Sequence, residues 1–336
     1  MKIALDGMGG DYAPKAQVEG AILAARLLPD DRIVITGNRD LIERELSFHK
    51  DVPRGISVEH APEVVEMTDE PAAAYRQKKN SSLAVAVRMV ADGAADAVVS
   101  AGNSGAVMAA ALFDLKRIEG ISRPALAALF PTLKGTCVIL DVGANVDSRP
   151  AHLLHFALMG KIYAREALGI GDPAVGLVSI GEEDSKGNEL TLETLKLIRE
   201  REKNFVGNIE GRDIPMGLVD VAVCDGFVGN VILKFGEGVG EMLFKLIKQA
   251  LKKHPVTWLS LPFLWAAMKD LRKKADYSEY GGALLLGVRG ACFICHGRSN
   301  AKSIKNALLK AASYAKHDIT RKIEERLKEY ANGNAA

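Results

Sequence analysis

Two apolar patterns alternate along most of this chain. Short runs rich in Val, Ile, Leu and Ala predict strands, and apolar residues at helical spacing fill most of the gaps between them. One predicted helix follows Pro14, with apolar positions at i, i+3, i+4 and i+7 from Val18 to Ala25, and another covers 81–91 with Asn80 or Ser81 as its cap. Because parallel strands need crossover connections, this alternation predicts a mainly parallel sheet covered by helices. The expected strands lie near 2–6, 32–36, 56–60, 96–100, 125–130, 137–142, 174–180, 205–209 and 219–224.

The pattern changes from Val228 onward. A long apolar stripe predicts a helix that runs to about Lys253, and this stripe either packs internally or pairs with another subunit. We expect one α/β domain over 1–336, interrupted by a helical excursion with an apolar tip at about 241–278. The chain then returns to the core through 283–294 and ends in two helices, at about 300–316 and 318–331.

The composition is that of an ordinary globular enzyme, with 48% hydrophobic and 26% charged residues. Four cysteines are too few for a disulfide framework, so a reducing cytoplasm is expected. Lys2 leads directly into a short strand without the apolar segment of a secretory signal. No apolar run reaches about 18 residues, so no membrane span is expected.

One cysteine pair has a functional spacing. Cys292, Cys295 and His296 match the C-x-x-C-H pattern of haem attachment and half of a zinc site. The run from Ala291 to Ile294 has the pattern of a buried strand, and no second cysteine pair supplies further ligands. We therefore interpret both thiols as core residues and expect neither a metal nor a cofactor. His296, at the strand end, could approach a cleft.

Glycine beside a polar residue ends six apolar runs, each of which continues into helix-like sequence. In an open α/β sheet such junctions gather at the carboxyl ends of the strands, where backbone N–H groups and helix N-termini favour anions. A cleft for a phosphate-like anion is therefore expected. The six junctions are Leu5–Gly7, Ala101–Asn103, Val142–Asn145, Ile180–Glu183, Ile209–Gly211 and Cys224–Gly226.

The first three junctions supply candidate anion ligands. The turn after the first strand is either an anion-binding loop or a tight connection, and it has neither the dinucleotide fingerprint nor the P-loop pattern. Asn103 and Ser104 serve either as helix caps or as ligand groups, and the similar turn at Asn145 and Asp147 favours ligand binding. The expected substrate-binding residues here are Asp6, Gly7, Gly9, Gly10, Asp11, Gly102, Ser104 and Asp147, with Asn103 and Asn145 as catalytic candidates.

Charged groups follow the later strands. Lys186 lies in a glycine-bounded loop with Glu182 and Glu183, which is either a solvated loop or a place where a lysine neutralises phosphate or an oxyanion. We expect Lys186 to be the main charged catalytic group. Asp225 either orients substrate or caps the long helix that follows. Glu182, Glu183, Asn230 and His296 complete the predicted substrate site.

An apolar aromatic segment inside a basic region predicts membrane contact. Eight Lys/Arg residues and one acid lie between Lys245 and Lys274. Such a segment can insert its apolar groups while its cations meet anionic lipid. A dimer contact or a dock for an acidic partner is the rival interpretation, and nucleic acid is not an expected partner. The predicted membrane contacts are Trp258, Leu259, Leu261, Phe263, Leu264 and Trp265.

Seven motifs in order resemble those of the bacterial phosphate acyltransferase family, PlsX. The resemblance covers residue 3 to about 310, and the order and spacing of the set make it specific. Cys292 and Cys295 are not part of the family pattern. The motifs are LDGMGGD, SAGNSGA, GANVD, IGEEDSKG, NIEGRD, CDGFVGN and HGRSN.

The resemblance implies transfer of a fatty acyl group from acyl carrier protein to inorganic phosphate, which gives acyl phosphate for phospholipid synthesis. It also implies a three-layer α/β/α fold similar to isocitrate dehydrogenase and phosphotransacetylase, with a protruding helical hairpin. A homodimer that associates peripherally with the membrane is expected, and the membrane glycerol-3-phosphate acyltransferase that uses acyl phosphate is a further expected partner.

The chemistry suits the candidate residues. Phosphate is largely a dianion at neutral pH and can attack a thioester without a protein nucleophile, so the protein must mainly position the reactants. Backbone N–H groups near Gly7 to Gly10 and Gly102 to Ser104, together with Asn145 and Lys186, are expected to hold phosphate and the oxyanion. Two alternatives are a nicotinamide-dependent dehydrogenase of the related fold and a non-catalytic scaffold for lipid enzymes.

Overall fold

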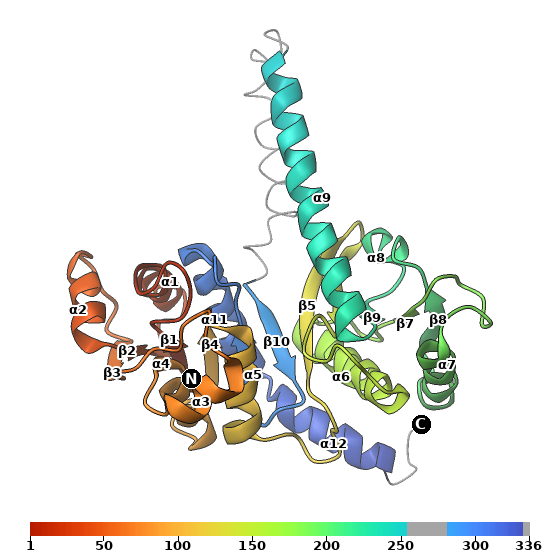
Figure 1. Ribbon diagram of the computed structural model, residues 1–336, viewed down its shortest axis with the longest axis horizontal. Helices are drawn as coiled ribbons and strands as arrows, with labels where there is room; N and C mark the ends of the chain where they lie inside the picture. Colours follow the sequence, from red (N-terminus) through yellow and green to blue (C-terminus); the bar gives the residue numbers. More distant parts are fainter. Residues whose placement is uncertain (254–280, 332–336) are drawn as a thin grey trace.

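One sheet of eleven strands runs through the computed structural model, which describes residues 1–253 and 281–331 (Figure 1). The strand order across the sheet is β3-β2-β1-β4-β11-β10-β5-β6-β9-β7-β8. The strands are β1 (Lys2–Asp6), β2 (Arg32–Gly37), β3 (Ile56–His60), β4 (Ala97–Ser100), β5 (Ala125–Thr132), β6 (Gly135–Leu140), β7 (Val175–Val178), β8 (Phe205–Ile209), β9 (Val221–Val223), β10 (Ala283–Leu286) and β11 (Ala291–Ile294).

Strand direction reverses in the middle of the sheet. β10 is antiparallel to both β11 and β5, and β5 is antiparallel to β6, whereas the remaining pairs are parallel. Three antiparallel steps mean that β1 to β4 and β11 point opposite to β6 to β9. The expectation that all six glycine junctions share one edge is therefore wrong: they lie at two opposite edges. The sequence predicted a strand at 125–130 and a return to the core through 283–294, but it indicated neither β10 as a separate strand nor the direction of β5.

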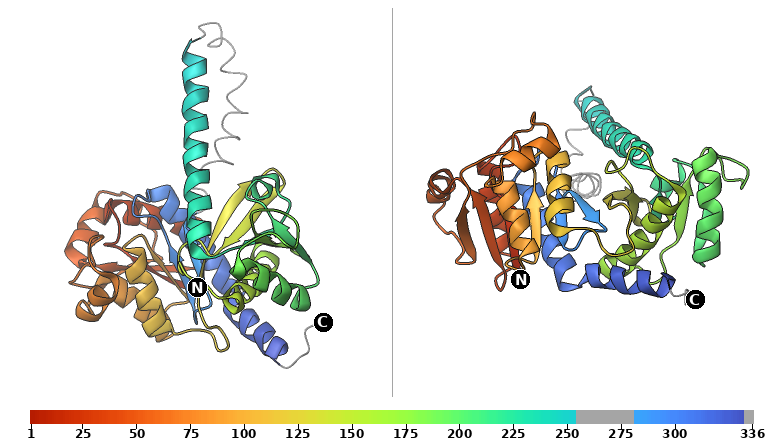
Figure 2. Two further views of the ribbon diagram at one scale, coloured as in Figure 1. Left: turned by 45° about the vertical axis from the view of Figure 1, so that its right-hand side comes forward. Right: turned by 60° about the horizontal axis from the view of Figure 1, so that its bottom comes forward.

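Helices cover both faces of the sheet in a three-layer arrangement (Figure 2). One face is covered by α1, α2, α6, α7, α11 and α12, and the other by α3, α4, α5, α8 and α9. Their bounds are α1 (Lys15–Ala25), α2 (Arg39–Ser47), α3 (Pro71–Gln77), α4 (Ser82–Ala91), α5 (Ser104–Ala110) with a π-helical turn at Ala111–Leu115, α6 (Pro150–Leu168), α7 (Glu189–Arg201), α8 (Asp213–Met216), α9 (Gly226–Lys253), α11 (Ala301–Lys316) and α12 (Ile319–Ala331).

The apolar core is continuous on one face and divided on the other. Under α1, α6 and α11, a single buried cluster extends from Ile3 through Phe156 to Leu308. On the opposite face, one cluster surrounds Val107 and a second surrounds Ile139. Leu126 of β5 packs against both clusters. The two halves of this face therefore meet along a seam over β5.

Most expected elements are present near their expected positions. The cap of α4 is Ser81, whose side chain accepts the Ala84 N–H at 3.3 Å, and α9 starts at Gly226, close to the predicted position. No helix of the described residues is long and apolar enough to cross a membrane. The predicted tip from Trp258 to Trp265 lies outside the described residues, and the single-domain assignment over 1–336 stays a prediction.

The first turn of α9 packs directly on the end of β6. A Cβ atom on Gly229 would lie well inside contact distance of the Asp141 carbonyl oxygen, so only glycine allows this approach. Gly238, two turns further along the same helix, has open space around its Cβ position.

These two glycines give a matched test of the packing. Gly229→Ala is expected to lower the free energy of unfolding by about 3 kcal/mol, because backbone must move to admit the methyl group. Gly238→Ala is expected to raise it by up to about 1 kcal/mol through helix propensity. Urea denaturation measures both. Equal stability of the two variants would contradict the close packing.

Candidate active site

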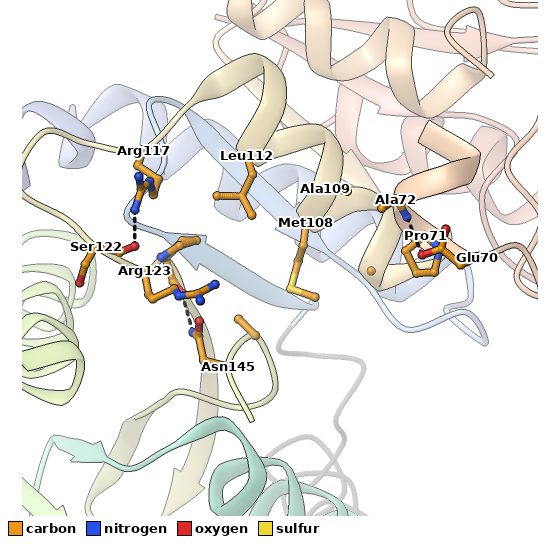
Figure 3. Close-up of a pocket in the computed structure, with 13 residues that line it drawn as sticks. Glu70, Pro71, Ala72, Met108, Ala109, Leu112, Arg117, Ser122, Arg123 and Asn145 are labelled. Carbon is orange, nitrogen blue, oxygen red and sulfur yellow. Dashed lines mark hydrogen bonds between the residues drawn. The ribbon is translucent and has the colours of Figure 1, made fainter. Parts of the chain in front are cut away.

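A cleft of about 590 Å³ lies at the seam between the two halves (Figure 3). Helices α3 and α5 form one wall, and the segment before β5 together with the turn after β6 forms the other. The wall from α5 is apolar, with Met108 and Leu112, whereas the opposite wall is polar. The lining residues are Glu70, Pro71, Ala72, Gly105, Met108, Ala109, Leu112, Arg117, Ser122, Arg123, Pro124, Ala144 and Asn145.

The Asp141 carboxylate organises the turn beside this cleft. It follows β6, is fully buried, and accepts N–H groups from Gly143 at 3.1 Å, Ala144 at 3.0 Å and Asn145 at 2.6 Å. It also accepts the backbone N–H of Leu126 at 2.9 Å, which joins the turn to β5. Burial raises the pKa of the Asp141 carboxyl, and these donors oppose that rise because they stabilise the ionised form.

Asn145 is held firmly at the edge of the cleft. Its side-chain Nδ2 donates to Asp141 Oδ2 and to the Pro124 carbonyl oxygen, each at 2.8 Å (Figure 3). Its own carbonyl oxygen accepts the Gly226 N–H at 2.8 Å, which fixes the start of α9. The turn, the segment before β5 and the start of α9 therefore form one connected unit.

The turn after β1 lies at the opposite edge of the sheet. Asp6 Oδ2 accepts the Ser100 hydroxyl at 2.6 Å, and burial raises the pKa of the Asp6 carboxyl. A Cβ atom on Gly9 would come within 2.7 Å of the Gly102 nitrogen, so the turns after β1 and β4 touch through backbone. The Asp11 N–H donates to the Gly297 carbonyl oxygen at 2.8 Å. The ends of β1, β4 and β11 thus meet, as their motifs predicted, with Gly7, Gly10 and Ser104 in the same two turns.

Asn103 caps α5 and supports the loop that precedes α3. Its Oδ1 accepts the Ala106 N–H at 3.1 Å, and its Nδ2 donates to the carbonyl oxygens of Met67 and Asp69. This loop leads to Glu70, whose carboxylate caps α3 at the rim of the cleft. His296 is exposed, and its Nδ1 accepts the Arg298 N–H at 3.2 Å.

The remaining candidates lie at the edge shared by β6 to β9. Lys186 is exposed, as are Glu182, Glu183, Asp147 and Asn230. Glu182 forms an ion pair with Arg212 at 3.7 Å. β9 separates β6 from β7, so the strand that precedes Lys186 lies about 10 Å from the strand that precedes Asn145.

Asp225 occupies the start of α9. Its Oδ1 accepts the Val228 N–H at 2.9 Å, so it caps this helix, one of the two roles expected for it. Among the predicted site residues that the structure describes, Asn145 alone lines the cleft. Asn103 caps α5, which forms part of its wall, whereas Asp225 caps α9, none of whose described residues lines it.

Sequence reasoning missed three groups at the cleft. Asp141 lies within a predicted strand, and nothing in the surrounding sequence indicated a role at the cleft. Arg117 and Arg123 lie in an irregular segment with no glycine motif. Only the tertiary structure shows that these two arginines line the cleft.

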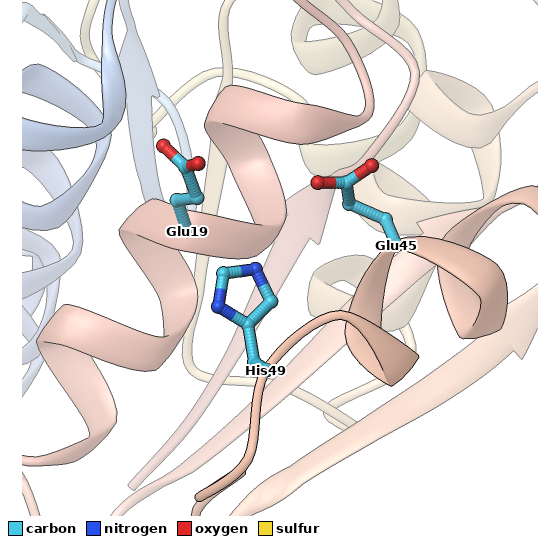
Figure 4. Close-up of side chains that lie close together, drawn as sticks. All are labelled: Glu19, Glu45 and His49. Carbon is cyan, nitrogen blue, oxygen red and sulfur yellow. The ribbon is translucent and has the colours of Figure 1, made fainter.

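One group of side chains in the described residues could hold a metal ion, and it lies away from the cleft (Figure 4). Ligand atoms of Glu19, Glu45 and His49 lie within 4.8 Å of one another, near the β3 edge of the sheet. All three side chains are partly exposed, and nothing links them to the candidate site. The cysteines are free and buried, and burial raises the pKa of Cys292 and Cys295 to about 12, in keeping with their interpretation as core residues.

Comparisons with known proteins define the class of this chain. The family model described as fatty acid synthesis protein matches residues 1–322. A phosphate acyltransferase of Endomicrobium trichonymphae is 54% identical over 99% of both chains, and that of Trichlorobacter lovleyi is 50% identical over 98% of this chain and 95% of its own. A phosphotransacetylase from Streptococcus pyogenes shares the fold, with a TM-score of 0.62, 18% identity and 94% coverage of each chain.

The chain therefore belongs to the fatty acid synthesis protein family, whose similar curated members are phosphate acyltransferases. It is an enzyme of this class, so the expected fold and the expected class of phosphate acyltransferase are confirmed. The dehydrogenase and scaffold alternatives have no support from these relatives.

Replacing the buried carboxylate tests the organisation of the cleft. Asp141→Asn is expected to lower the free energy of unfolding by about 3 kcal/mol, because the amide offers one acceptor atom where two served several N–H donors. Denaturant unfolding measures the loss. Asp147→Asn, an exposed neighbour, is the control and should leave stability within about 0.5 kcal/mol. A similar stability for both variants would show that Asp141 does not hold the turn.

Proposed function

We propose that this phosphate acyltransferase moves a fatty acyl group from an acyl carrier protein thioester to inorganic phosphate, forming acyl phosphate for phospholipid synthesis. Family membership supports the reaction class. The observation that supports a location for the reaction is the cleft at the seam. Its apolar wall suits an acyl chain, and its opposite wall is polar and contains the rigidly held Asn145.

The proposed chemistry needs no nucleophile from the protein. A phosphate oxygen attacks the thioester carbonyl carbon and forms a tetrahedral oxyanion. Collapse of this intermediate breaks the carbon–sulfur bond, releases the carrier thiolate, which takes up a proton, and leaves the acyl group on phosphate. Catalysis then depends on holding both reactants and stabilising the oxyanion.

We assign the predicted residues different parts in this reaction. Lys186 and Asn145 are proposed to meet the reacting groups, since Lys186 has an exposed ammonium and Asn145 borders the cleft. Asn103 and Asp225 are proposed to act through position, because their side chains cap α5 and α9. The turns after β1 and β4 are proposed to supply backbone donors for phosphate or for the carrier arm.

The reaction is tested directly with acyl carrier protein thioester and labelled phosphate. Formation of labelled acyl phosphate, trapped with hydroxylamine as the hydroxamate, is the expected result. Absence of the product at saturating concentrations of both substrates would overturn the proposal. An absorbance change that required a nicotinamide cofactor would indicate the dehydrogenase alternative.

Removing the proposed charged group should slow turnover. Lys186→Ala is expected to lower kcat by about 100-fold, the effect typical of losing one oxyanion donor, while leaving the melting temperature unchanged. Lys196→Ala, an exposed lysine on the following helix, is the control and should retain full activity. Near-normal turnover of the Lys186 variant would remove this residue from the mechanism.

We further propose that two copies of the chain associate through α9. Large apolar residues on this helix are exposed in the single chain, including Phe235, which is 71% exposed. Exposed apolar surface of this kind is typical of a subunit interface. The other exposed apolar side chains of α9 are Phe227, Val231, Met242, Leu243 and Leu246.

Peripheral membrane contact, and through it delivery of acyl phosphate to a membrane acyltransferase, stays a proposal based on the sequence between Trp258 and Trp265. The double variant Trp258→Ala with Trp265→Ala is expected to lose co-sedimentation with anionic vesicles while keeping activity in solution. Vesicle binding equal to that of the parent would contradict this role. A parallel Lys2→Ala variant controls for simple loss of a side chain.

A further inference from the structure

The polar wall of the cleft carries two arginines that have no assigned role. Arg117 and Arg123 both line it, and both side chains are exposed (Figure 3). Among the lining residues that the structure describes, the only acidic one is Glu70, whose carboxylate already accepts the N–H groups of Ala72 and Ala73. The cleft therefore presents an excess of positive charge.

The segment that carries these arginines is anchored on both sides. The backbone of Arg117 forms an isolated antiparallel β-bridge with Val288, between β10 and β11. Its guanidinium donates to the Ser122 carbonyl oxygen. The residue after Arg123 is Pro124, whose carbonyl oxygen accepts Asn145 Nδ2 at 2.8 Å. Arg123 thus projects from backbone that is tied to the Asp141 turn through Pro124 and Asn145, and little order has to be gained when a ligand binds.

Arg123 has spare hydrogen-bonding capacity. Across the described part of the chain, its guanidinium makes no hydrogen bond or ion pair. Its charge nevertheless acts on a neighbour: burial, then Arg123 and Arg149, lower the pKa of His152. His152 lies in the first turn of α6, a turn without acidic residues, so no carboxylate there neutralises Arg123.

A planar guanidinium with unused donors matches a phosphate group, which it can bind through two parallel hydrogen bonds. We infer that Arg123, assisted by Arg117, binds a phosphate oxyanion of the substrates in this cleft. The inference rests on the proposed function for its choice of substrate. Two groups offer this chemistry: inorganic phosphate itself and the phosphodiester of the pantetheine arm on the carrier protein.

Steady-state kinetics of Arg123→Gln distinguish these sources. The Michaelis constant of the ligand that Arg123 binds is expected to rise about tenfold or more, with kcat less affected. If the ligand is inorganic phosphate, its KM rises with the carrier thioester and also with an acyl-pantetheine thioester that lacks the phosphodiester. If the ligand is the phosphodiester, the KM for the carrier thioester rises, and the variant equals the parent with acyl-pantetheine.

Three controls keep the result interpretable. Arg44→Gln makes the same chemical change on exposed α2 and should match the parent. Arg123→Lys, which keeps the charge but loses the planar fork, should recover part of the affinity. Circular dichroism and melting temperature establish that each variant is folded. Folded Arg123→Gln with every KM within twofold of the parent would overturn the inference.

Direct binding separates this inference from the proposed reaction. An oxyanion on Arg123 offsets the positive charge that His152 senses, so it should raise the pKa of that imidazole. NMR titration of His152 in the parent, with inorganic phosphate and separately with 4′-phosphopantetheine, measures this shift without turnover. A shift that disappears in Arg123→Gln supports the site even if no acyl phosphate forms. No shift with either probe would overturn it.

Discussion

The cleft depends on one buried carboxylate. Asp141 accepts N–H groups from the turn that follows it and from Leu126 of the neighbouring strand. The same turn accepts the N–H of Gly226, the first residue of α9, through the Asn145 carbonyl oxygen. A buried carboxylate is tolerated only when donors surround it, so alternative arrangements of this turn would be costly. The polar wall that carries Asn145 is therefore fixed before any substrate arrives.

This fixed wall matters because of the chemistry that the enzyme class performs. Phosphate brings its own nucleophilic oxygen, so the protein contributes mainly position and electrostatic stabilisation. The rigid amide of Asn145 and the arginines before β5 lie on one wall of the cleft, and the apolar wall from α5 lies opposite them. They come from both halves of the sheet, and the reversal of strand direction at β5 and β10 brings those halves together.

Local features were predictable because nearby residues decide them. The cap at Ser81, the strand Ala291–Ile294 with its buried thiols and the long apolar helix after Cys224 all follow from short-range pattern. Asn145 was found because glycine and amide residues at a strand end carry a recognisable signal. The roles of Asn103 and Asp225 were ambiguous because the same short motif, a polar residue at the start of a helix, can cap the helix or bind a ligand.

The sequence by itself determined the elements, the glycine turns and, through seven ordered motifs, the enzyme class. Only the tertiary structure decided that β5 and β10 run against their neighbours, that the glycine turns occupy two edges, and that Arg123 faces a cleft. Strand direction and cleft position depend on pairing between segments far apart in the chain, such as Leu126 with Leu285. Local periodicity records whether a residue is buried, but not which distant residue lies beside it.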